Sequence, residues 1–134
     1  MNYWMVKTEP GDYTWEQFEQ EGVTMWDGVR NYQARNNLRS MRIGDYVLFY
    51  RSVKNPAVMG IARVVREAYP DPTIDDDRWV AVDFKVVRSL PRPVLLKEIK
   101  ATPQLRDLPL LRQPRLSVMP LTRQQFETII KMAD

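Results

Sequence analysis

The most informative stretch of the chain covers residues 26–39 and reads Trp26-Asp27-Gly28-Val29-Arg30-Asn31-Tyr32-Gln33-Ala34-Arg35-Asn36-Asn37-Leu38-Arg39. It combines aromatic, amide and guanidinium side chains with few aliphatic ones. A core helix does not need this composition, whereas a surface that stacks on a flat ring, bonds its polar edge and neutralises phosphate does. We therefore expect nucleic-acid or nucleobase recognition here; for any single residue, a polar N-capped surface helix is the alternative.

The second half of this stretch is predicted to form an amphipathic helix that begins after the candidate N-cap Asn31. The residues with core-facing helical spacing are Ala34, Leu38 and Met41. Three arginines have the same spacing, each one residue later: Arg35, Arg39 and Arg42. These arginines therefore form a basic stripe on the adjacent face.

The flanking sequence predicts a single α+β domain over residues 1–134. Strands are expected over residues 2–7, 46–50, 57–68, 79–88 and 115–119, and helices over 15–21 and 95–100 and after Thr122. Thr14 with Gln17 and Thr122 with Gln125 are expected to form capping boxes at two of these helices. Pro91 and Pro93 are expected to end the fourth strand and Pro120 the last, and Gly60 to mark a bulge or close approach. Residues 103–114 should form a loop whose leucines pack on the core. The sum is a curved, mostly antiparallel sheet or small barrel with helices over its openings.

The amino-acid composition excludes several kinds of catalytic and metal-binding site. The chain of 134 residues has no cysteine and no histidine, which excludes disulfides, thiolate nucleophiles, Ser-His-Asp and Cys-His catalysis and the usual zinc sites. Carboxylates, lysine or a carboxylate-held metal remain as possible catalysts. The net charge of +3 permits a polyanionic partner without requiring one. No signal-peptide core or membrane-length apolar run is found, so we expect a cytoplasmic protein without a membrane partner.

Further polar residues stand at predicted strand ends. Lys7-Thr8-Glu9-Pro10 follows the first strand and could border a pocket or form a simple turn. Tyr50-Arg51-Ser52 ends a buried strand and leads to Lys54. Ser117 is a lone hydroxyl in an apolar strand, which needs a backbone or ligand partner.

Two residues of the central stretch have competing interpretations. Trp26, before a turn dipeptide, can be a stacking platform or a core anchor. Asn31 can read a base edge or be used as the helix cap. Among the acidic residues, Asp12 with Glu16 and the run 75–77 are the only groupings suggestive of metal or acid–base work, and we interpret the run as a solvated loop.

The chain resembles the EVE-domain proteins of the PUA-like superfamily, a group with many bacterial single-domain members. The matching stretches run in the family's order and are residues 3–10, 26–36, 44–50, 60–65, 69–73 and 115–118. The resemblance implies a PUA-like curved antiparallel β-barrel of five to six strands with peripheral helices. The first motif commonly reads Lys-Ser-Glu-Pro in the family; Thr8 keeps the hydroxyl and adds a methyl group here, which narrows the site.

The resemblance also implies a binding mode: a modified base, chiefly a modified cytosine in DNA, is flipped into a pocket. The residues carried over to the base pocket are Lys7, Thr8, Trp26, Arg30, Asn31, Tyr50 and Ser117. Those carried over to the phosphate backbone are Arg35, Arg51 and Lys54. No catalytic residue, metal or cofactor is implied.

Our hypothesis is therefore a monomeric, non-enzymatic reader of a modified base in DNA. The first alternative is the same binding mode with RNA. A second is a metal-assisted nuclease that uses Glu9, Asp12 or Glu16, and a third is a protein-interaction module. The sequence does not separate DNA from RNA or name the modification.

Overall fold

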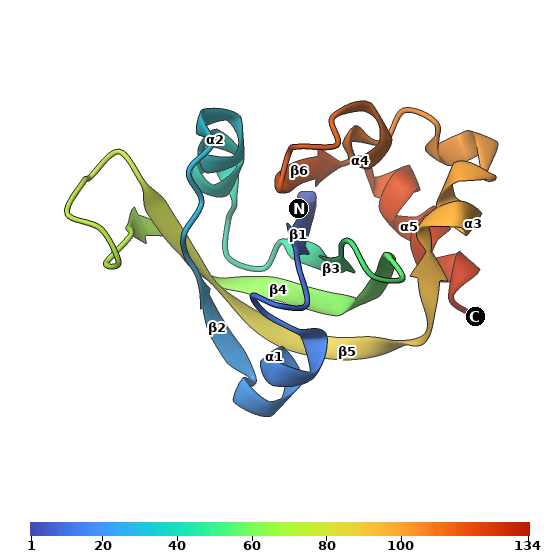
Figure 1. Cartoon of the computed structure of the whole chain (residues 1–134), viewed down its shortest axis with the longest axis horizontal. Helices are drawn as coiled ribbons and strands as arrows, with labels where there is room; N and C mark the ends of the chain where they lie inside the picture. The colour runs from blue at the N-terminus through green and yellow to red at the C-terminus, as the bar shows by residue number, and fades with distance from the viewer.

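The protein, described here from a computed structural model of residues 1–134, is built on one six-stranded sheet (Figure 1). The strands are β1 (Tyr3–Thr8), β2 (Val23–Trp26), β3 (Tyr46–Arg51), β4 (Ala57–Pro70), β5 (Val80–Leu95) and β6 (Val118–Leu121). The helices are α1 (Trp15–Glu21), α2 (Tyr32–Ser40), α3 (Leu96–Lys100), α4 (Pro109–Arg112) and α5 (Arg123–Met132), with a 3₁₀ turn η1 (Pro103–Leu105). The long strands β4 and β5 arch across the molecule, and α3, α4 and α5 gather near one end of them.

The sheet is mixed and open. Its order is β2-β5-β4-β3-β1-β6, and the pairing of β1 with β3 is parallel while every other pairing is antiparallel. The predicted α+β, PUA-like class is confirmed, but the predicted antiparallel barrel is corrected to a curved sheet with two edges. Helix α2 contacts both β5 and β6, and Asn37 Nδ2 donates to the Val118 carbonyl at 2.7 Å. A helix therefore covers the gap where closing strands would pair.

Three prolines do not end strands as predicted. Strand β5 continues through Pro91 and Pro93, and Pro120 lies inside β6. Proline lacks an N–H and is tolerated where that side of the strand faces no partner. β6 pairs only with β1, and β2 covers β5 only over Val82–Lys85, so each proline lies on an unpaired edge. The last strand also starts later than predicted, which leaves Ser117 just before it.

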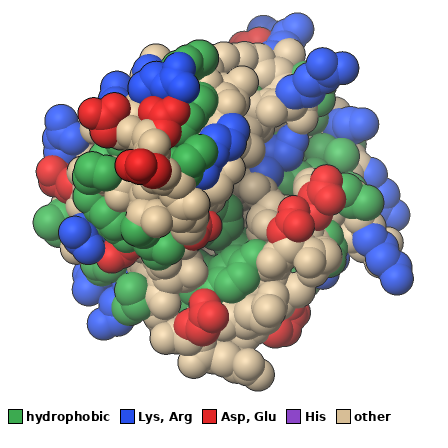
Figure 2. All heavy atoms as spheres, turned by 60° about the vertical axis from the view of Figure 1, so that its left-hand side comes forward, with side chains coloured by type: hydrophobic (Ala, Val, Ile, Leu, Met, Phe, Trp, Pro, Cys, Tyr) green, Lys and Arg blue, Asp and Glu red, His purple; other side chains and the backbone are tan.

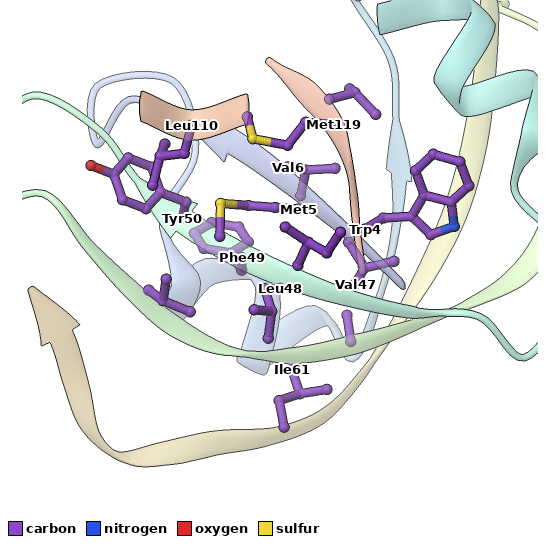
Figure 3. Packing of buried hydrophobic residues seen from close by; sticks show 14 of the residues in the cluster. Trp4, Met5, Val6, Val47, Leu48, Phe49, Tyr50, Ile61, Leu110 and Met119 are labelled. Atoms are coloured by element: carbon purple, nitrogen blue, oxygen red, sulfur yellow. The ribbon is translucent and has the colours of Figure 1, made fainter. Parts of the chain in front are cut away.

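One buried hydrophobic cluster joins the strands of the sheet to the helices α1, α2 and α5. Figure 3 shows side chains from β1, β3 and β6 in mutual contact, with Met5, Leu48 and Met119 fully buried. The segment predicted as a loop over 103–114 instead contains η1 and α4. Of its leucines, Leu105, Leu108 and Leu110 are buried and Leu111 is half-buried against the core, as expected.

Local signals at helix ends and at Gly60 are confirmed. Thr14 and Thr122 each form a capping box with a glutamine three residues later. At Gly60 the indole of Trp15 lies so close that an added Cβ would be 2.1 Å from its Cζ2 atom. Trp15 Nε1 also donates to Ser89 Oγ at 2.8 Å, so this ring is held from both sides.

Candidate nucleic-acid interface

Four separate segments enclose a cavity of about 870 Å³. The lining residues are 7–9, 24–30, 52–53 and 114–117, together with Asp12, Tyr13 and Glu21. This volume lies within the range of roughly 300–1,000 Å³ that is typical of ligand pockets. The structure brings five of the predicted base-pocket residues to this cavity: Lys7, Thr8, Trp26, Arg30 and Ser117.

The end of β1 ties the walls of the cavity together. Lys7 N–H donates to the Ser117 carbonyl at 2.9 Å, and Lys7 Nζ donates to the Pro114 carbonyl at 2.7 Å. Burial lowers the pKa of this ammonium group. The Thr8 carbonyl accepts from the backbone N–H and from Oγ of Ser52, at 2.9 and 3.1 Å. The β1 end therefore fixes both the 114–117 segment and the start of the β3–β4 loop.

Trp26 is chiefly a core residue with a small part of its surface in the cavity. It is 8% exposed, and its ring meets Phe49 at 5.9 Å and 86°, Phe84 at 5.6 Å and 47°, and Tyr13 at 6.1 Å and 78°. Of the two interpretations from sequence, the core anchor is the one that the packing supports. The side chain can still present part of its ring to a ligand.

Two predicted pocket residues lie outside the cavity. Asn31 Oδ1 accepts from the Ala34 N–H at 2.9 Å, so the carbonyl end of its amide caps α2. Asn31 instead lines an adjacent recess of about 410 Å³ whose other residues are Gln33, Gln113, Pro114, Arg115 and Leu116. Tyr50 is 2% exposed and belongs to the core, where burial raises its pKa to about 12.

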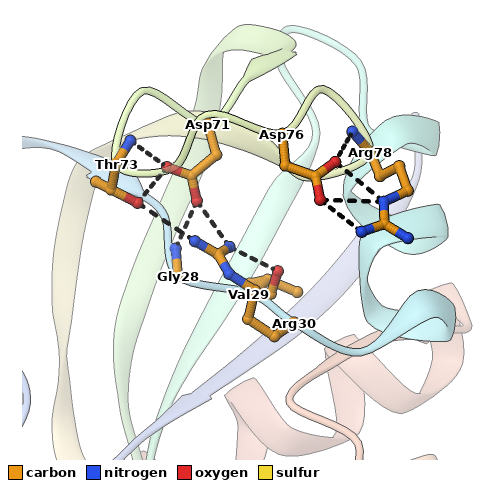
Figure 4. Close-up of polar contacts among 7 residues, drawn as sticks. All are labelled: Gly28, Val29, Arg30, Asp71, Thr73, Asp76 and Arg78. Carbon is orange, nitrogen blue, oxygen red and sulfur yellow. Dashed lines mark hydrogen bonds and ion pairs between the residues drawn. The ribbon is translucent and has the colours of Figure 1, made fainter.

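Asp71 is the residue that sequence reasoning missed and that shapes one wall of the cavity (Figure 4). Its buried carboxylate accepts from Gly28 N–H at 2.9 Å, Arg30 Nη1 at 3.0 Å, Thr73 N–H at 2.8 Å and Thr73 Oγ1 at 2.5 Å. Burial alone would raise its pKa, but the hydrogen bonds from Thr73, Gly28 and Arg30 outweigh that effect and hold the pKa at about 2. The strand end at Asp71 thus fixes the Gly28 turn, which has φ +74°, and the Arg30 side chain.

The three predicted phosphate-binding residues are placed differently from one another. The Arg35 guanidinium lies 4.8 Å from the Tyr32 ring and donates to the Arg78 carbonyl at 3.2 Å. Arg51 donates from Nε and Nη2 to the Asn55 carbonyl, at 3.2 and 2.7 Å, so it closes the β3–β4 loop. Lys54 is exposed and lies with Arg51 at a second recess of about 310 Å³, beside the main cavity.

Charges of both signs border the cavity. The acidic side chains are Glu9, Asp12, Glu21 and Asp27, and the basic ones are Lys7, Arg30 and Arg115. Figure 2 shows a hollowed face on which hydrophobic side chains lie low and acidic and basic side chains both occur around them. Of these acidic residues, the sequence had singled out Glu9 and Asp12 as candidate functional groups, whereas Glu21 and Asp27 were not expected at the cavity.

The carboxylates do not assemble into a metal centre. Glu9 and Asp12 line the main cavity, whereas Glu16 lies at the second recess. No group of three acidic residues is arranged to hold a metal ion. No helix is long and apolar enough to cross a lipid bilayer.

The model of the EVE domain family matches residues 2–132. The chain belongs to the EVE domain family. Thymocyte nuclear protein 1 of Mus musculus is 35% identical over 172 residues, which cover 99% of this chain and 74% of that protein. The comparison therefore confirms the resemblance drawn from the stretches around Lys7, Trp26 and Ser117.

Two solved EVE-type structures are especially informative. Protein Atu2648 from Agrobacterium tumefaciens is 42% identical with a TM-score of 0.97, over 99% of this chain and 93% of that one. Human THYN1 protein, solved in complex with DNA that contains 5-methylcytosine, is 32% identical with a TM-score of 0.95, over 100% of this chain and 98% of that one. That EVE domain binds methylated DNA with the fold described here.

Proposed function

We propose that this EVE domain is a non-enzymatic reader of modified cytosine in DNA, and that the flipped base enters the cavity of about 870 Å³. The observation that carries the proposal is the coincidence of this cavity with a fold that matches DNA-bound human THYN1 at a TM-score of 0.95. Extrusion of a base costs a few kcal/mol, which contacts inside the cavity must offset.

The acidic rim suits cytosine in particular. The exocyclic N4 amine of cytosine is a donor, and Asp or Glu carboxylates accept from it. Glu9 and Asp27 line the cavity, and neither side chain has a hydrogen-bond partner in the protein. Thymine presents an acceptor, O4, at the same place, so carboxylates disfavour it.

The remaining cavity residues divide into two roles. Thr8 and Ser117 offer hydroxyls that can donate or accept at the base edge, and the exposed part of Trp26 offers an apolar contact to the ring. Lys7 and Arg30, whose side-chain nitrogens bond the Pro114 carbonyl and the Asp71 carboxylate, supply positive charge at the cavity wall. RNA remains the second candidate ligand, since a flipped cytosine presents the same edge in either nucleic acid.

The test is a titration at fixed salt with matched duplexes that differ in one base opposite guanine: 5-methylcytosine, cytosine, 5-hydroxymethylcytosine or thymine. We expect the tightest binding for a modified cytosine. The thymine duplex should bind more weakly even though its mismatch makes flipping easier. Equal, salt-dependent affinity for all four would reduce the surface to a general polyanion site, and preference for the same sequence as RNA would favour the second candidate.

A further inference from the structure

Val53, at the tip of the β3–β4 loop, has a backbone conformation that its own side chain disfavours. Its φ is +74°, in the left-handed region that β-branched residues rarely enter. The side chain is 69% exposed, so no core contact explains the conformation. The only other non-glycine residue with positive φ is Asn55, a residue type that tolerates it.

The loop that carries Val53 is held firmly on both sides. Ser52 makes two hydrogen bonds to the Thr8 carbonyl, at 2.9 and 3.1 Å. Arg51 donates twice to the Asn55 carbonyl, at 3.2 and 2.7 Å. The surrounding contacts therefore impose the strained conformation and project an apolar side chain from a fixed position. Strain that persists in this way is typical of ligand-contacting segments.

The place of this side chain is informative. Val53 and Ser52 line the base cavity on the same side as Thr8. The next residue, Lys54, is exposed and has no ion-pair partner. An apolar tip beside a cation at the mouth of a cavity matches the residues that enter DNA between base steps, where the apolar group partly replaces stacking and the cation meets phosphate.

We propose that Val53 is a wedge that enters the duplex and occupies the space left by the flipped base. This inference rests on the proposed function, because a wedge is needed only if the base leaves a stacked duplex. A base that is already in single-stranded DNA has no such space to fill. The wedge should therefore contribute to binding of duplex DNA and not to binding of a single strand that carries the same base.

The test compares two probes of one sequence, a duplex and a single strand, each with one 5-methylcytosine. Val53→Gly removes the side chain and suits the positive φ, so the loop keeps its shape; Val53→Asn, which also tolerates that φ, replaces the apolar group by a polar one. Ile43→Ala is the matched control, since Ile43 is 65% exposed and lies outside all three recesses.

We expect both Val53 variants to bind the duplex about tenfold more weakly or worse and to bind the single strand within about twofold of wild type. Ile43→Ala should change neither. Equal loss on both probes would overturn the wedge in favour of a direct contact to the base. Unchanged duplex binding, while wild type still prefers 5-methylcytosine over cytosine, would overturn the wedge and leave the reader intact. If wild type shows no preference for 5-methylcytosine over cytosine, the proposed function is contradicted, and the wedge proposal with it.

Discussion

The carboxylate of Asp71 accepts a 2.9 Å hydrogen bond from the backbone N–H of Gly28, although 43 positions separate the two residues. This bond and the Arg30–Asp71 ion pair attach the wall of the cavity to the end of β4. The wall is thereby set by a residue that does not line the cavity itself.

Stability should depend on the charge of Asp71. Its pKa of about 2 lies below the ordinary value of 3.8, so the stabilisation is complete above about pH 5 and is lost as pH falls from about 4 to 2. Wild type should lose about 2 kcal/mol of unfolding free energy over that window from this group, and Asp71→Asn should lack that component. Urea unfolding at a series of pH values measures it. The control Asp107→Asn alters an exposed pair with Arg112 and should shift stability by less than about 1 kcal/mol.

Trp26→Ala should destabilise the protein strongly. Because the ring contacts Phe49, Phe84 and Tyr13 and is only 8% exposed, its removal leaves a large core cavity, with an expected cost of about 3–5 kcal/mol. Thermal unfolding followed by circular dichroism measures this loss. An unchanged melting temperature would show that the ring packs less tightly than described.

Gly60→Ala should displace the Trp15 indole. The new Cβ would lie 2.1 Å from the ring, so the indole must move and its bond to Ser89 is broken. We expect the free energy of unfolding to fall by about 1–3 kcal/mol. The control is Gly11→Ala, where no heavy atom lies within 4 Å of the added Cβ. Equal stability of the two variants would contradict the close packing.

Arg115→Ala should lower the salt dependence of DNA binding. Arg115 is exposed and lies between the base cavity and the adjacent recess, and its side chain has no ion pair in the protein. Loss of one phosphate contact should reduce the slope of log affinity against log salt by about 0.9. Arg123→Ala, which removes the same charge from α5, controls for net charge. The same slope in both variants would exclude a phosphate role for Arg115.

The features that were predicted correctly depend on residues close together in the sequence. The capping boxes at Thr14 and Thr122 and the helix cap at Asn31 each involve a partner three residues away. Pro91 and Pro120 were wrongly predicted to end strands. A strand tolerates proline where one of its sides has no partner strand, and strand pairing depends on the whole sheet.

The candidate site was predicted in part for the same reason. Two motifs can each be recognised from adjacent residues, one around Lys7 and Thr8 and one around Trp26 and Arg30. The structure brings both to one cavity. The role of Asp71 could not be foreseen, because it lies about forty positions from its donors Gly28 and Arg30. Asp71 approaches them only when the β4–β5 connection folds over the start of α2. The place of Tyr50 in the core could not be foreseen, because a position at the end of a buried strand does not say whether the side chain emerges or is covered.

The pairing of β1 has a consequence for how the protein forms. Its first partner, β3, follows about forty residues later, and its second, β6, follows only near Val118. Contacts of such high sequence separation slow folding, and an unpaired strand edge exposed meanwhile can associate with other chains. During synthesis one edge of β1 therefore stays open until the segment that includes Ser117 has left the ribosome. Residues 114–117, just before this strand, also line the cavity, so a nascent chain truncated before them would lack one cavity wall and should depend on chaperones.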